Sequence, residues 1–78
     1  MAKYEPLRRY LARQKTARVD LTFAEIERLI GALLPKRAQS PNWWNPGDED
    51  AVQAQAWRSA GFVAGLNGRE QVRFDKNL

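Results

Sequence analysis

The feature that most restricts this chain is the absence of both cysteine and histidine over its 78 residues. Short domains often add disulfides or a structural zinc ion to a small core. Neither device can be built here, because the residues that form it are missing. A single domain spanning residues 1–78 must therefore be held by ordinary apolar packing, for which three Trp and three Phe are available.

The same absence removes most catalytic chemistry. Cysteine nucleophiles, Ser-His-Asp triads and histidine general bases all need residues that the chain lacks. The acidic run Asp48-Glu49-Asp50 is not expected to hold a metal, because consecutive helical residues point in different directions. We therefore expect no enzymatic activity, no metal and no cofactor.

Charge and hydropathy indicate the class of partner. The formal net charge of +4 and the pI near 10.0 indicate either a polyanionic partner or a role of the charge in solubility alone. The excess lies in residues 1–18, where Glu5 is the one acidic side chain among several basic ones. The N-terminus lacks a signal-peptide h-region, and no apolar run is longer than Ala32-Leu33-Leu34. These features predict a cytoplasmic protein that does not enter a membrane.

Apolar periodicity predicts a first helix over residues 4–14 and a short strand over residues 17–21. A capping box follows, with Thr22 at the N-cap and Glu25 at the third helical position. The second helix is therefore predicted over residues 23–30 and ends before a glycine.

The middle of the chain is less regular. A short helix is predicted over residues 34–39 with Pro35 in its first turn, and Ser40-Pro41-Asn42 is predicted to be a turn. The third main helix is expected to begin at the acidic run, because carboxylates complement the dipole of a helix start, and to end near Ala60. Its core stripe is predicted to hold Val52, Ala56 and Ala60, with Trp57 at the edge.

Asn67-Gly68 predicts a tight hairpin between strands at residues 62–66 and 69–75. With a two-residue turn, Val63 pairs with Val72 and faces the core. Phe62, Ala64 and Leu66 are then expected on the opposite face. A four-residue turn would preserve these faces.

The predicted order, α-β-α-α-β-β, indicates an α+β fold with three main helices packed on a small three-stranded antiparallel sheet. This order resembles the winged helix-turn-helix domains over the whole chain. The strings LTFAEIE from Leu21, WWN from Trp43 and AQAWRSAGF from Ala54 also resemble a family of small uncharacterised bacterial domains. The winged-helix resemblance implies DNA binding, as in a small regulator or nucleoid-type factor. One departure is the long connection between the second and third main helices, where a compact helix-turn-helix has three or four residues.

The resemblance and the charge lead to double-stranded DNA as the expected partner. Either the 34–39 segment or the 48–60 helix would serve as the recognition helix, and the oligomeric state stays open. Basic side chains contact phosphates, while Arg and Gln also read base edges. The candidate DNA-binding residues are Arg8, Arg9, Arg13, Lys36, Arg37, Gln39, Ser40, Asn42, Asn45, Gln55, Arg58, Ser59, Arg69 and Arg73.

The pair Trp43-Trp44 supports an alternative function. Adjacent residues rarely point the same way, so we expect one buried ring and one more exposed ring. An exposed Trp44 would anchor a protein partner, as aromatic hot spots do. The alternative is therefore a protein-interaction module, such as a phage or plasmid accessory protein or a domain appended to a larger enzyme. A further interpretation places both rings in the core with Trp57.

Overall fold

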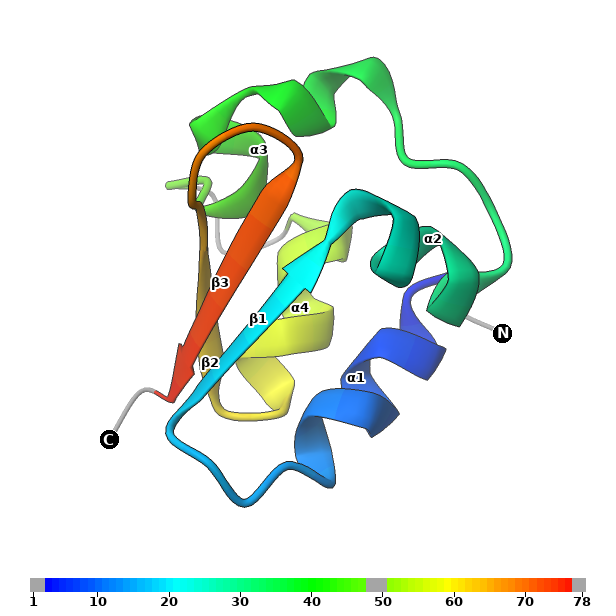
Figure 1. Cartoon of the computed structure of the whole chain (residues 1–78). Helices are drawn as coiled ribbons and strands as arrows, with labels where there is room; N and C mark the ends of the chain where they lie inside the picture. The colour runs from blue at the N-terminus through cyan, green and yellow to red at the C-terminus, as the bar shows by residue number, and fades with distance from the viewer. Residues whose placement is uncertain (1–2, 48–50, 77–78) are drawn as a thin grey trace.

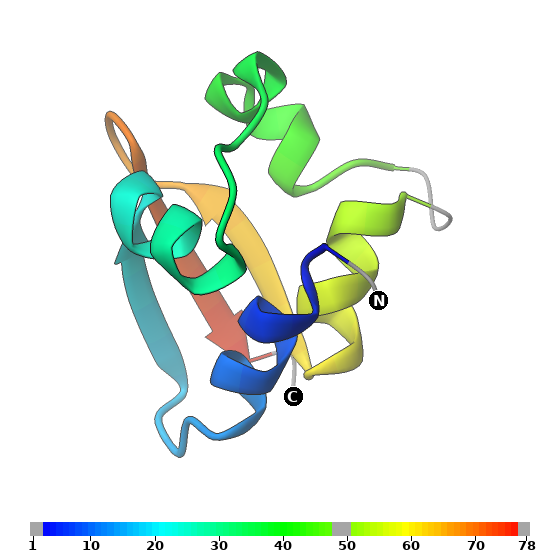
Figure 2. The same cartoon turned by 90° about the vertical axis from the view of Figure 1, so that its right-hand side faces the viewer.

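The computed structural model describes residues 3–47 and 51–76 of the chain. Three antiparallel strands form a sheet, and the helices pack against one of its faces (Figure 1 and Figure 2). No helix among the residues described has the length and apolar character needed to cross a membrane. In chain order the elements are α1 (Glu5–Ala12), β1 (Arg18–Thr22), α2 (Phe23–Ile30), the 3-10 helix η1 (Lys36–Gln39), α3 (Pro41–Trp44), α4 (Val52–Ser59), β2 (Phe62–Leu66) and β3 (Gln71–Lys76).

The predicted capping box starts α2. The Thr22 hydroxyl accepts a hydrogen bond from the Glu25 amide at 3.1 Å, and the Glu25 carboxylate accepts one from the Thr22 amide at 2.8 Å. The bond from the Thr22 amide stabilises the carboxylate and is the first cause of the lowered pKa of Glu25. At the other end Gly31 adopts a left-handed conformation with φ of 70° and ends the helix.

The strands run in the order β1-β3-β2, and the predicted core face of β2 is wrong. Ala64 pairs with Phe74, whereas Val63 pairs with Asp75 and is 40% exposed. The cause is the turn: the Asn67 amide donates to the Gln71 carbonyl at 2.9 Å, which leaves three residues between them. An odd number of turn residues reverses the pairing parity and turns every side chain of β2 to the other face. This register buries Phe62, which removes more apolar surface from water than Val63 would.

The predicted core stripe of the third main helix is confirmed for Ala56, Ala60 and the edge residue Trp57, and it is wrong for Val52. Val52 is 68% exposed, while Ala54 is fully buried. Trp57 offers the largest apolar area in this helix, and a helix rotated to bury that ring turns Val52 towards solvent. The helix begins at Val52, and the acidic run that was expected to open it lies outside the described residues.

The segment between α2 and α4 contains two short helices. Residues 36–39 form a 3-10 helix in which Pro35 occupies the N-cap and not the first helical position. The predicted turn at residues 40–42 is instead the start of α3, with Pro41 in its first turn. Proline suits this place because it lacks an amide hydrogen, and an amide hydrogen in the first helical turn would have no acceptor within the helix.

Both rings of the tryptophan pair lie in the core, so the expectation of an exposed Trp44 is wrong. Trp43 is 8% exposed and Trp44 is fully buried, and the Trp44 and Trp57 ring centroids lie 5.2 Å apart. The single turn of α3 separates the two side chains by about 100°, and both rings still reach the Trp57 cluster. The Trp44 indole donates to the Ala38 carbonyl at 2.7 Å, and the Trp57 indole donates to the Trp44 carbonyl at 3.2 Å.

Candidate nucleic-acid interface

Segment 36–45 separates its side chains sharply by polarity. Ala38, Trp43 and Trp44 are buried and hold the segment on the core. The candidate DNA-binding side chains predicted in this stretch are all exposed: Lys36, Arg37, Gln39, Ser40, Asn42 and Asn45. The segment therefore presents six hydrogen-bonding side chains to solvent.

The turn between β2 and β3 lies at the same end of the molecule as η1 and α3 (Figure 1 and Figure 2). Lys36 and Gln39 from η1 line one cavity together with Glu70 of the turn. Arg69, the residue before Glu70, is exposed. We call residues 36–45 and 67–70 together the η1–turn surface. It carries three cationic side chains, on Lys36, Arg37 and Arg69, and one carboxylate, on Glu70.

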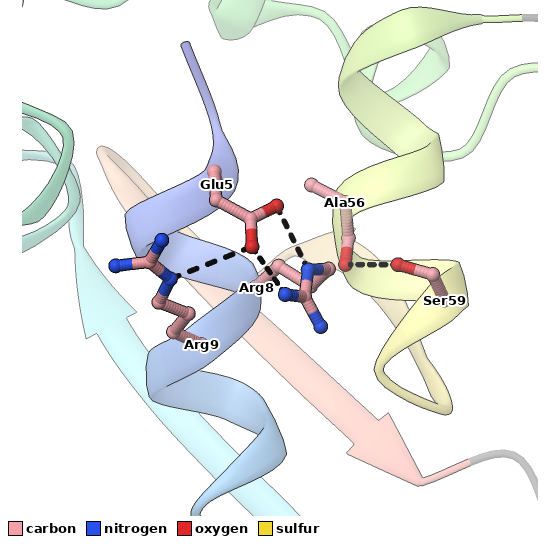
Figure 3. A network of polar contacts seen from close by, with 5 residues as sticks. All are labelled: Glu5, Arg8, Arg9, Ala56 and Ser59. Atoms are coloured by element: carbon pink, nitrogen blue, oxygen red, sulfur yellow. Dashed lines mark hydrogen bonds and ion pairs between the residues drawn. The ribbon is translucent and has the colours of Figure 1, made fainter. Parts of the chain in front are cut away.

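The basic residues of α1 are largely engaged with one carboxylate (Figure 3). Arg8 binds Glu5 through two hydrogen bonds, the Nε–Oε1 bond measuring 2.9 Å, and Arg9 Nε lies 3.5 Å from the same carboxylate. The bond from Arg8 is the first cause of the lowered pKa of Glu5, and the same bond raises the pKa of Arg8. Arg13 caps the far end of α1, next to the connection to β1 at the opposite end of the molecule.

The outer face of the sheet holds two ion pairs. Arg18 lies 3.3 Å from Asp75, and Arg73 lies 3.5 Å from Asp20. Each pair joins residues that are direct neighbours across β1 and β3. Arg73 is therefore charge-balanced within the sheet and does not extend from the tip of the hairpin.

The long polar side chains of α4 hold the preceding loop. Arg58 donates to the Pro46 carbonyl at 2.7 Å, and Gln53 donates to the Trp43 carbonyl at 3.1 Å. The Ser59 hydroxyl donates to the Ala56 carbonyl within the helix at 3.2 Å. Gln55 and Ser59 are exposed but line a groove against α1, beside Arg8. The sequence interpretation did not include Gln53, and no local pattern marks a glutamine that binds a main-chain carbonyl.

Nearly the whole chain matches one protein family. A family model described as "Domain of unknown function (DUF7662)" matches residues 4–77. The chain belongs to this family. No curated protein and no solved structure matches the chain. The DUF7662 match contains every helix and strand of the fold and the whole η1–turn surface, and it bears out the expected membership in a family of small uncharacterised domains.

The polar groups of the DUF7662 domain suit binding through hydrogen bonds and charge. Within residues 3–47 and 51–76, no group of three or more carboxylate, histidine or cysteine side chains could hold a metal ion. The structure thus brings the predicted residues together in two places. One is the η1–turn surface, and the other is the groove between α1 and α4, where Arg8, Gln55 and Ser59 meet.

Proposed function

We propose that this domain binds double-stranded DNA through the η1–turn surface and catalyses no reaction. The observation that carries the proposal is the division of segment 36–45 into buried apolar anchors and exposed polar side chains. Arginine, lysine, serine and asparagine side chains are the usual partners of phosphate oxygens in protein–DNA complexes. Arg69 extends this set of donors onto the adjacent turn.

The architecture supports the same proposal. Two residues separate α4 from β2, and the chain then turns back through the β2–β3 hairpin to complete the antiparallel sheet. A last helix followed by a hairpin resembles the winged-helix order, in which the hairpin turn is the wing. We therefore propose a small winged-helix-like regulator or nucleoid-type factor, with residues 67–70 as a short wing.

The alternative of a protein-interaction module loses its anchor in this structure. Trp43 and Trp44 are both buried among the core rings. A partner could reach either indole only after the core had opened. No exposed aromatic ring on this loop therefore supports that function.

Fluorescence anisotropy with a labelled duplex tests the proposal. The wild-type chain is expected to bind at low salt and to weaken as salt rises, because neutralised phosphates release counterions. The double variant K36A/R37A should bind at least about tenfold more weakly. The matched control K15A/K76A loses the same charge from exposed positions away from the surface and should bind like wild type. The absence of wild-type binding to any duplex at low salt would refute the proposed function.

A further inference from the structure

Two elements compete for the role of contact element. Segment 36–45 and α4 both carry residues of the types that bind DNA. What differs between them is whether these side chains already have partners within the chain.

Most polar side chains of α4 bind main-chain carbonyls of the protein itself. Arg58 donates to the carbonyl of Pro46 in the loop that joins α3 to α4, and Gln53 donates to the carbonyl of Trp43 in α3. Gln55 faces the groove beside the Glu5–Arg8 ion pair. Reading a base edge requires a bidentate pair of free donors or acceptors in the major groove. Of the side chains of α4 that could make such a pair, Arg58 and Gln53 are bonded to main-chain carbonyls, and Gln55 lines the groove against α1.

Segment 36–45 exposes its polar side chains, but its two helices are short. η1 has four residues, so its length is about 8 Å at the rise of a 3-10 helix. The hydrogen bond from the Trp44 indole to the Ala38 carbonyl holds η1 down on α3. The major groove admits a whole α-helix, whereas η1 is little more than one helical turn held on α3. Its cations can reach phosphates along the rim of a groove.

We infer that the chain contacts the phosphate backbone of duplex DNA without reading its sequence, through Lys36, Arg37 and Arg69, while α4 supports the surface from behind. This inference rests on the proposed function and specifies how the DNA is bound. Among the residues that the structure describes, these three cations have no ion-pair partner and share one surface, whereas Arg8, Arg9, Arg18 and Arg73 are paired. Within the same described part of the chain, the cations Arg13, Lys15, Arg28 and Lys76 also lack an ion pair but lie outside that surface. Three phosphate contacts give a slope of log K against log salt of about −2.7, at about −0.9 for each phosphate neutralised.

The test measures anisotropy with three duplexes of equal length, one of mixed sequence, one A-tract and one G+C-rich, over about 20–200 mM salt. The wild type should bind all three within about threefold and show the slope above. The triple variant K36A/R37A/R69A should lose most of the affinity and most of the slope. The charge-matched K15A/R28A/K76A and the α4 variant Q55A/S59A should bind like wild type. All these side chains are exposed, and tryptophan fluorescence verifies that each variant is folded.

The outcomes separate the mode from the function. A preference of more than about tenfold for one duplex, or loss of binding in Q55A/S59A, would overturn the inference and leave DNA binding in place. The inference would also be overturned if the triple variant bound DNA as tightly as the wild type. Equal losses of affinity in the triple variant and in its charge-matched control would overturn it as well. If the wild type binds no duplex at any salt concentration, the proposed function itself fails.

Discussion

Segment 36–45 and α4 are neighbours in the structure, yet they use their polar side chains in opposite ways. The segment turns its apolar residues inward and leaves its polar residues in solvent. α4 also buries its apolar face, but Arg58 binds the Pro46 carbonyl in the loop before it, and Gln53 binds the Trp43 carbonyl in α3. An irregular loop leaves backbone carbonyls without regular partners, and nearby side chains satisfy them. Residue type alone therefore does not separate a binding side chain from one that holds a loop in place.

The largest effect expected from either region comes from the anchor of segment 36–45. Trp44→Ala should lower the free energy of unfolding by about 3–5 kcal/mol, because it removes a fully buried ring and leaves a cavity. Urea unfolding followed by circular dichroism measures the loss. Trp44→Phe should cost less, because it keeps a ring and loses mainly the indole bond to Ala38. A loss below about 1 kcal/mol in Trp44→Ala would contradict the assignment of the segment to the core.

A second prediction compares one arginine from each region. Arg58→Ala should lower the free energy of unfolding by about 1–2 kcal/mol, because the Pro46 carbonyl loses a charged donor. Arg37→Ala should change it by less than about 0.5 kcal/mol, since Arg37 is exposed. The same urea titration serves both variants. Equal losses of stability in the two variants would contradict the claim that Arg58 holds the loop while Arg37 does not support the fold.

The turn offers a prediction in the opposite direction. Glu70 has a positive φ of 55°, a conformation that is strained for a residue with a side chain. Glu70→Gly should raise the free energy of unfolding by about 1 kcal/mol and should also tighten DNA binding, because a carboxylate leaves the η1–turn surface. Thermal unfolding and anisotropy measure the two effects, with Glu70→Gln as the control that removes the charge and keeps the side chain. Weaker binding by both variants would contradict the proposed surface.

The smallest effect concerns pH and lies outside both regions. The pKa values of Glu5 and Glu25 are lowered in the folded chain, so their contribution is complete at neutral pH and is lost as the pH falls through the folded pKa values. The variant E5Q/E25Q should therefore lose less stability between pH 6 and pH 3 than wild type, as urea titrations across that range would show. A steeper loss of stability in the variant than in the wild type would contradict the lowered pKa values of Glu5 and Glu25.

Local signals predicted some elements well. The capping box and Gly31 fixed the limits of α2, because both act through bonds within a few residues of sequence. The face of β2 depended on a single residue of turn length, which Asn67-Gly68 does not determine. The face that α4 buries depended on the packing of Trp57 against Trp44, which is a tertiary contact.

The candidate site was also predicted only in part, because the sequence marks local features and does not mark tertiary partners. The exposed residues of segment 36–45 follow from polarity along a short stretch of chain. The engagement of Arg8 with Glu5 was within reach of the sequence, since residues three apart on a helix are neighbours. The bonds from Arg58 and Gln53 join α4 to residues 10 or more positions away, and no periodicity in the sequence marks such partners.

The most direct test of the central claim is an amide chemical-shift map of the ¹⁵N-labelled chain titrated with a mixed-sequence duplex at low salt. The account predicts that the largest shifts fall in residues 36–45 and 67–70, with the exposed face of α4 around Gln55 and Ser59 little changed. Shifts concentrated on that face of α4 and in the α1 groove, or no shifts at all, would contradict it.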